Sequence, residues 1–278
     1  MSNHRIITAP QTIDLNEYNT ADTGDLKQKD AAAAQTKLEK RLVQLQELLY
    51  AASKQSVLIV LQGMDTAGKD GTIKHVMSAV NPVGCHVWSF KQPTPDEAAH
   101  DFLWRIHQRT PAQGMLHIFN RSHYEDVLVV RVHKLVPREV WSERFEQINH
   151  FEQLLAQNGT IILKFFLHLS KSEQKRRLLA REDDRDKAWK LSAADWKERD
   201  LWHDYQEAYA DTIGKCGTKH APWTIVPADH KWYRNYFIAQ QLVDRLEPLA
   251  KDWEAALEAR GQTELAALKA LHAGEAQA

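Results

Sequence analysis

The sequence is poor in the residues and runs that mark several protein classes. It has only two cysteines, Cys85 and Cys216, which lie far apart with no Cys-x-x-Cys or Cys/His ligand spacing. This argues against a zinc site and fits a reducing cytoplasm. No run approaches the ~18 apolar residues of a membrane span, and the first twenty residues lack the apolar core of a signal peptide. We expect a cytoplasmic protein with no membrane partner.

The chain also lacks an excess of charge of either sign. Its formal net charge is -1, with 36 Lys and Arg residues against 37 Asp and Glu residues. This balance gives no global basic field for nucleic acid, so a polyanion site has to come from local clusters of Lys and Arg. Hydrophobic residues make up 43% and charged residues 26% of the chain, with 11 Gly and 9 Pro. The profile is that of an ordinary globular protein, long enough for one large α/β domain with helical additions.

Short apolar runs alternate along the chain with segments of helical periodicity. Residues 1–30 are polar and irregular, and a long helix is expected next, at residues 31–55. Strands are expected at 56–61, 85–90, 115–119, 161–169 and 223–227, and further helices at 68–80, 96–107, 137–157, 170–181, 193–215 and 232–248. This order predicts the α/β class, a parallel sheet covered by helices on both faces. The Ala-rich tail after residue 251 is expected to form a peripheral helix or to fray.

The stretch LQGMDTAGKDGTIKH, after the first of these strands, has the spacing of a phosphate-binding loop. Gly63, Gly68 and Lys69 follow the pattern G-x4-G-K, and Asp70 stands where such loops carry Ser or Thr. Between a strand and a helix, the backbone N–H groups of such a loop converge on phosphate oxygens. Asp65 and Asp70 would repel phosphate directly, which indicates a divalent cation, magnesium, between them. The alternatives are a plain tight turn for the loop and, for Asp70, a carboxylate favoured by the helix dipole.

A second polar group, FNRSHYED, begins where the strand at 115–119 ends. Ligands in open α/β sheets bind at the carboxyl ends of strands. Glu125 and Asp126 lie close to Arg121 in the sequence, and together they can hold metal and phosphate, since arginine binds phosphate oxygens in bidentate fashion. The alternative is a solvated, salt-bridged helix start. His123 has no partner at metal-ligand spacing, which favours a capping or packing role.

Basic residues gather at 175–190, after the strand at 161–169. Arg177, Arg181 and Arg185 recur every four residues and share one helical face if the helix extends that far. Such a run is commonly a solvated face, but beyond the carboxyl end of a strand it can be a lid that closes over transferring phosphates. No Ser, Cys or His has a recognisable nucleophile–base arrangement, and phosphoryl transfer needs none.

Over roughly residues 30–250, the sequence resembles the type-2 polyphosphate kinases. The resemblance rests on GMDTAGKDGTIKH, SFKQPTPDEAAHDFLWRIH, FNRSHYEDVLVVRVH, KFFLHLSKSEQKRRL with its continuation to DKAWK, and APWTIVPADHKWYRN, in the family's order. It implies a P-loop kinase-like three-layer α/β/α fold with a helical lid. It also implies an enzyme that uses inorganic polyphosphate, with magnesium or manganese as cofactor, to interconvert AMP, ADP and ATP. The NRSHYEDV form resembles the subgroup that accepts both AMP and ADP.

The resemblance further implies roles for individual residues. Asp65 and Asp126 look like the magnesium carboxylates, and Lys69 and Arg121 join them as catalytic residues. The implied phosphate- and nucleotide-binding positions are Gly63, Ala67, Gly68, Lys69, Asp70, Gly71, Lys74, Asn120, Arg121, Glu125, Arg131, Arg177 and Arg181. Many relatives have Asp where this chain has Asn120, which removes one charge from the edge of the site.

The expected organisation is an N-terminal extension with a long helix at 1–55, a catalytic domain at 56–250 with a lid at about 170–192, and a helical or disordered tail at 251–278. The resemblance and the long first helix favour a homo-oligomer, either a dimer or a tetramer. Two other functions stay open. An ATP-dependent nucleoside monophosphate kinase would suit the fold, although the missing loop Ser/Thr counts against it, and so would a noncatalytic polyphosphate-binding regulator.

Overall fold

The computed structural model describes residues 5–78, 80–183 and 193–275. In this part of the chain one sheet has six strands in the order β1-β6-β5-β2-β4-β3. The strands are β1 (Ile6–Ile7), β2 (Ser56–Gln62), β3 (Cys85–Ser89), β4 (Leu116–Asn120), β5 (Thr160–His168) and β6 (Trp223–Pro227). Strands β2 to β6 pair in parallel, as predicted, and β1 pairs with β6 in antiparallel fashion. Two residues are too short to show a strand period, which is why the sequence did not reveal β1.

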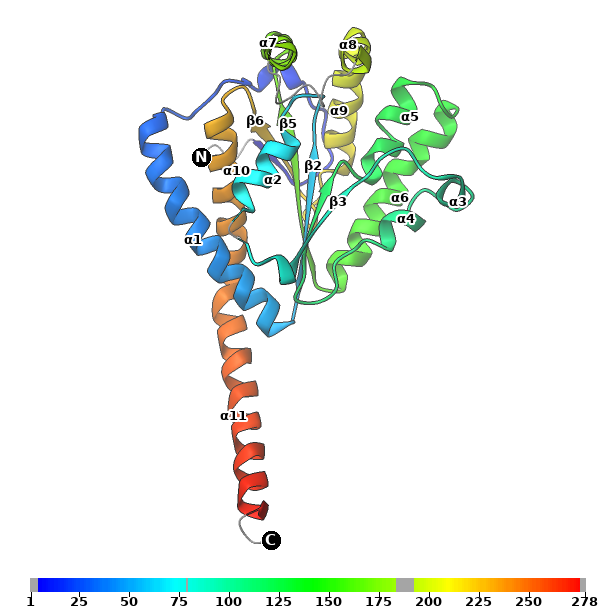
Figure 1. The fold of residues 1–278 in the computed structure, drawn as a ribbon. Coiled ribbons are helices and arrows are strands. Elements are labelled where there is room, and N and C mark those ends of the chain that lie inside the picture. Colours follow the sequence, from blue (N-terminus) through cyan, green and yellow to red (C-terminus); the bar gives the residue numbers. More distant parts are fainter. Residues whose placement is uncertain (1–4, 79, 184–192, 276–278) are drawn as a thin grey trace.

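Helices cover both faces of the sheet (Figure 1). The helices on one face are α1 (Gln28–Ala52), α2 (Lys69–Val76) and α10 (Lys231–Leu246), and those on the other are α5 (Val129–Val132), α6 (Arg138–Gln157) and α9 (Trp202–Cys216). Along β2, Val57 and Ile59 belong to one hydrophobic core, and Leu58 and Val60 belong to the other. Every residue of this central strand is buried. The predicted three-layer α/β/α fold is confirmed.

Two predicted helices are each divided, so those predictions were wrong. The segment 96–107 forms α3 (Pro95–Ala98) and α4 (Trp104–His107), because a capping box between Thr94 and Glu97 starts a first turn and Asp101 accepts from the N–H of Leu103 to start another. The segment 193–215 forms α8 (Ala193–Asp200) and α9, which are separated at Leu201.

The lid predicted at about 170–192 is described only in part. Helix α7 (Lys171–Glu182) follows β5, and both α7 and α8 lie beyond the carboxyl edge of the sheet (Figure 1). Arg185, with the rest of residues 184–192, lies outside the described residues. The shared helical face expected for Arg177, Arg181 and Arg185 is therefore described only as far as Arg181.

Helix α11 (Ala250–Glu275) extends away from the domain (Figure 1). Its first turn is anchored by Trp253, which is fully buried and whose indole N–H donates to Gln55. Further along, Leu265, Leu268 and Leu271 are about half exposed. The tail is thus a helix, one of the two expected outcomes. No helix in the described residues is long and apolar enough to cross a membrane.

Candidate active site

The loop between β2 and α2 is closed around Lys69. The Lys69 side chain is buried, and its ammonium donates to the carbonyls of Gly63 at 2.7 Å and Met64 at 3.4 Å. Burial, with the nearby charge of Arg121, lowers the pKa of Lys69 to about 8. Gly68 has a φ of +105°, and a Cβ there would overlap the guanidinium of Arg234, so the second glycine of the motif is required by the packing.

In this loop the backbone carbonyls are hydrogen-bonded within the protein, whereas most of the backbone N–H groups are not. Every carbonyl from Gly63 to Gly68 accepts a hydrogen bond, from Lys69, Ala67, Gln174, Arg177, Arg234 or Thr72. Within the described part of the chain, five backbone N–H groups of the loop donate to no other residue: those of Met64, Asp65, Thr66, Gly68 and Lys69. The loop therefore presents donors to a ligand, which suits a phosphate at the first turn of α2.

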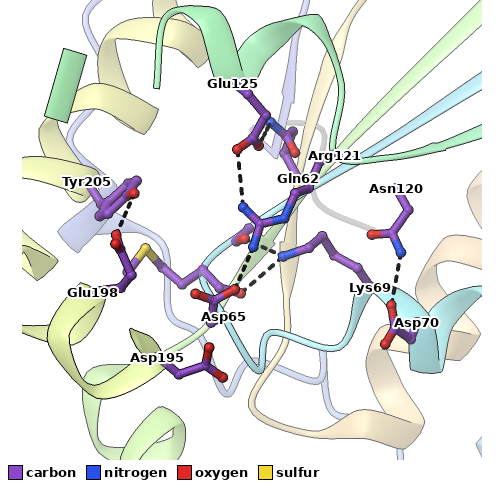
Figure 2. A network of polar contacts seen from close by, with 12 residues as sticks. Gln62, Asp65, Lys69, Asp70, Asn120, Arg121, Glu125, Asp195, Glu198 and Tyr205 are labelled. Atoms are coloured by element: carbon purple, nitrogen blue, oxygen red, sulfur yellow. Dashed lines mark hydrogen bonds and ion pairs between the residues drawn. The ribbon is translucent and has the colours of Figure 1, made fainter. Parts of the chain in front are cut away.

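Arg121 joins the loop to the end of β4 (Figure 2). Its guanidinium donates to Asp65 at 2.8 Å and to Glu125 at 3.2 Å. Glu125 also accepts from the amide of Gln62 at 2.9 Å. Arg121 has a φ of +64°, an unusual conformation for a non-glycine residue, and it turns the chain where β4 ends. The structure thus brings four of the predicted residues together: Asp65, Lys69, Arg121 and Glu125.

Asp126 pairs with a different arginine from Asp65. It is paired with Arg144 at 3.2 Å, and its carbonyl accepts from the same guanidinium at 3.0 Å. Burial raises the pKa of Asp126 to about 6, although Arg144 acts in the opposite direction. Asp126 lines a cavity of about 820 Å³, whereas Asp65 lines a smaller neighbouring cavity, and Arg121 and Glu125 line both.

The other residues predicted for the site have contacts of their own, outside this group of four. Asn120 donates to Asp70 at 2.9 Å, so Asp70 has a hydrogen-bonding role in the first turn of α2 (Figure 2). Lys74 is exposed on the last turn of α2. Arg131 is on α5, where it pairs with Asp211 at 2.6 Å. The carbonyl of Ala67 in the loop accepts from Arg234, and a Cβ at Gly71 of α2 would lie 3.2 Å from the same guanidinium.

Arg177, which was predicted to bind phosphate, does not reach outward in this structure. It is buried, and all five of its N–H groups are used within the protein. The acceptors are Glu173 and the carbonyls of Thr66, Ala67, Ala228 and Asp229, at 2.6 to 3.2 Å. The helical spacing in the sequence predicted which face of the helix carries Arg177. It could not predict that the loop and the segment after β6 pack against that face. Arg181 pairs with Asp195 at 3.0 Å.

Several site residues gave no signal in the sequence. Asp195 and Glu198 of α8 face the site near Asp65 (Figure 2), and Glu198 accepts from the hydroxyl of Tyr205 at 2.7 Å. Burial and the charge of Asp65 raise the pKa of Asp195. They went unnoticed because 193–215 was interpreted as a plain helix. Among the described residues, no group of three or more His, Cys, Asp or Glu side chains is placed to hold a metal alone.

A buried polar network supports the segment after β4. The inner side chains of the 3-10 turn η4 (His123–Asp126) are His123 and Tyr124, both fully buried. Glu152 accepts from Tyr124 at 2.8 Å and lies 3.2 Å from His123. Lys164 of β5 donates to Glu152 at 2.6 Å and to Tyr124 at 2.7 Å. His123 is therefore a packing residue, as its sequence context favoured.

A parallel α/β sheet with a glycine- and lysine-containing loop after its central strand, and charged groups at the same edge, defines a P-loop kinase-like protein. A family model described as Polyphosphate kinase 2 (PPK2) matches residues 25–254. The chain belongs to this family, whose members are phosphotransferases.

Individual relatives agree with this assignment. The chain is 50% identical over 242 residues to an AMP/ADP-polyphosphate phosphotransferase of Meiothermus ruber, covering 86% of this chain and 91% of that one. It is 45% identical over 232 residues to an ADP-polyphosphate phosphotransferase of Rhodopseudomonas palustris, covering 79% and 80%. The crystal structure of polyphosphate kinase 2 from Arthrobacter aurescens TC1 superposes with a TM-score of 0.83 at 40% identity, covering 87% and 93%.

Proposed function

We propose that this protein transfers the terminal phosphoryl group of inorganic polyphosphate to AMP and to ADP, reversibly and with a divalent cation. The observation that carries the proposal is the position of Arg121, which borders both the phosphate-type loop and the large cavity. A donor phosphate on the loop and an acceptor phosphate at the cavity would then meet at one guanidinium. The names of the Meiothermus and Rhodopseudomonas relatives support both acceptors.

The loop is suited to the donor. Its unpaired amides and Lys69 can bind the terminal phosphates of a chain that carries no base or sugar for recognition. The large cavity is suited to the acceptor. Its volume of about 820 Å³ lies within the range of small-molecule sites, and it combines Phe90 and Phe102 with the cations Arg105 and Arg144. A nucleotide needs such a combination, apolar surface for the base and cations for phosphate.

The reaction needs no covalent enzyme intermediate. An oxygen of the nucleotide phosphate attacks the terminal phosphorus of polyphosphate in line with the leaving oxygen. A new P–O bond forms to the acceptor, and the bond to the rest of the chain breaks, so that the shortened polyphosphate leaves with the electron pair. Arg121 and Lys69 stabilise the charge that spreads over the transferring group, and the loop and cavity hold the two phosphates in position.

The donor groups of the site fit magnesium or manganese. Asp65 and Asp126 would hold the metal, and substrate phosphates and water would supply the remaining ligands, as is usual for Mg²⁺ in phosphoryl-transfer sites. The side-chain carbonyl of the buried Gln62, next to Glu125, also has no hydrogen-bond partner in the described chain. When bound, the metal would neutralise phosphate oxygens and align them.

Two alternative functions are not favoured. An ATP-dependent nucleoside monophosphate kinase would use the same fold, but Asp70 replaces the loop Ser/Thr and is engaged by Asn120. A noncatalytic regulator would need no acidic residues beside the loop, yet Asp65, Glu125 and Asp195 are all there.

One assay tests the proposal. The purified protein is incubated with magnesium, long-chain polyphosphate and either AMP or ADP, without ATP, and the nucleotides are resolved. We expect AMP to yield ADP and then ATP. The variant Lys69→Ala should lose this activity, and so should the wild type in excess chelator. Product formation only when ATP is the donor would establish the monophosphate kinase instead, and no product from any donor would favour the regulator.

We also propose that the protein is a homo-oligomer, either a dimer or a tetramer. Half-exposed leucines on α11 support this, because they leave apolar surface uncovered in the single chain. Light scattering at assay concentrations measures the mass of the particle. A mass of 32.0 kDa, that of one chain, would contradict the proposal.

A further inference from the structure

The carbonyl groups of the loop between β2 and α2 are held by arginines from two other helices. Arg177 of α7 donates to the carbonyls of Thr66 at 3.0 Å and Ala67 at 3.2 Å. Arg234 of α10 donates to the carbonyl of Ala67 at 3.1 Å. The two arginines are 6% and 2% exposed. Two buried guanidinium groups therefore meet at one carbonyl oxygen of the loop.

Peptide geometry relates these contacts to the amides of the loop. The C=O and N–H of one trans peptide group point in opposite directions, and the described chain has no cis peptide. Holding the Ala67 carbonyl therefore aims the N–H of Gly68 to the other side, where it has no partner in the described chain. Gln174 of α7 acts in the same way. It donates to the Asp65 carbonyl at 3.2 Å, and the N–H of Thr66 then points away from α7.

The positive charge of Arg234 has no carboxylate partner among the described residues. Two more of its N–H groups donate to the neutral amide oxygen of Asn235 at 3.1 and 2.8 Å, and among the described residues no carboxylate accepts from it. Burial, with the charge of Arg177, lowers the pKa of Arg234 to about 10. A buried cation without a carboxylate is unfavourable in the free protein. An anion on the far side of the loop would stabilise it.

We propose that Arg177 and Arg234 are positioning residues for the phosphate donor. They hold the loop from its inner side, so that its amides stay aimed at the terminal phosphates, and their charges favour an anion there. This rests on the proposed function and deepens it, because it adds a supporting layer to the donor site. The proposal also accounts for Gly68, since a side chain at that position would displace Arg234.

The test compares Arg177→Gln and Arg234→Gln with Arg176→Gln. Arg176 is a matched control because it neighbours Arg177 on α7, is 66% exposed and pairs only with Glu173 in the described chain. Calorimetry with tripolyphosphate measures binding without catalysis. We expect Kd to rise about tenfold or more in the two buried variants and to stay near the wild-type value in Arg176→Gln. The KM for polyphosphate should rise in parallel, with the KM for AMP unchanged.

Lysine variants separate the positioning effect of each arginine from the effect of its charge. They also provide the test if the glutamine variants do not fold. Arg177→Lys and Arg234→Lys keep the cation, but an ammonium cannot span the carbonyls that a guanidinium holds, so they should restore binding only in part. Full recovery by lysine would overturn the positioning role. So would wild-type Kd in folded glutamine variants, with only melting temperature or active fraction reduced. If the wild type binds tripolyphosphate but makes no nucleotide product, the proposed function fails, and these Kd values still decide the role of the arginines.

Discussion

At the scale of single residues, each charge at the site has a defined partner. Asp65 and Glu125 share Arg121, Asp126 has Arg144, and Asp70 accepts from the neutral Asn120. A change of charge at one position therefore moves its partner as well. Because Arg121 borders both cavities, a shift of its guanidinium should act differently on acceptors of different length.

Acceptor choice tests this pairing. Asn120→Asp would place a second carboxylate against Asp70, where a 2.9 Å hydrogen bond now stands, and Glu125→Gln would weaken the hold on Arg121. The terminal phosphate of AMP and that of ADP must reach the donor from different depths, so we expect both variants to change the ratio of the two rates. Loss of a charge-assisted contact worth ~1.5–3 kcal/mol would change the ratio of the two rates roughly ten- to hundredfold if it affected only one of the two reactions.

Initial rates with AMP and with ADP are measured separately for each variant. Asp126→Asn provides the contrast, because loss of a metal carboxylate should abolish both reactions. Equal proportional losses on both acceptors in Asn120→Asp and Glu125→Gln would refute the selectivity claim and leave the phosphotransferase assignment intact.

At the scale of elements, the turn η4 connects the core to the site. Its first two residues, His123 and Tyr124, point into the buried network with Glu152 and Lys164, and its last two line the large cavity. One short turn thus transmits the position of β5 and α6 to the acidic pair. The ion pair that fixes it, Lys164 with Glu152, is fully buried.

Removing one partner of that pair should be costly. Lys164→Met leaves the Glu152 carboxylate buried without its cation, and breaking such a pair typically costs ~3–5 kcal/mol of unfolding free energy. Urea denaturation measures the loss. The double variant Lys164→Met with Glu152→Leu should lose less, because no isolated charge remains. If the single and double variants lose the same amount, the network contributes through packing alone.

Helix α11 offers a second test at this scale. Residues 261–272 are exposed in the single chain, so at a protein concentration low enough to leave it monomeric, ending the chain after Arg260 should change the free energy of unfolding by less than ~0.5 kcal/mol. Ending it after Ala250 also removes the buried Trp253, and ~3–5 kcal/mol should be lost. Thermal and urea unfolding of both forms give the comparison. A large loss from the shorter truncation would show that the end of α11 is covered in solution.

At the scale of the whole molecule, the sequence revealed the elements better than their contacts. The strand–loop–helix pattern around Lys69 and the strand alternation were enough to predict the sheet and its three layers, because each depends on local periodicity. Contacts between distant helices carry no such signal. Arg177 and Arg234 meet at the Ala67 carbonyl from far apart in the chain, and Asp195 approaches Asp65 only after α8 and α9 fold back. The pairing of Asp126 with Arg144 was hidden for the same reason.

The change of unfolding free energy with pH is a property of the whole molecule, and three buried histidines make the protein less stable as the pH is lowered. Burial lowers the pKa of His117, His123 and His168 below the usual value. The unfolded chain therefore binds protons below pH ~6.5 that the folded chain does not. Stability is full above that pH and falls as the pH is lowered, by ~1.4 kcal/mol per pH unit for each proton taken up on unfolding. The raised pKa of Asp126 acts in the opposite direction.

His168→Gln isolates one of these contributions. Glutamine can still donate to the Leu15 carbonyl, which His168 now contacts at 3.1 Å, but it takes up no proton on unfolding. We expect the slope of unfolding free energy against pH, measured by urea denaturation between pH 5 and 6.5, to decrease by up to the value for one proton. His203→Gln, on the exposed face of α9 with its side chain 86% accessible, is the matched control and should keep the wild-type slope. The same slope in both variants would mean that His168 is protonated equally in the folded and unfolded chain, contrary to its burial beneath the N-terminal segment.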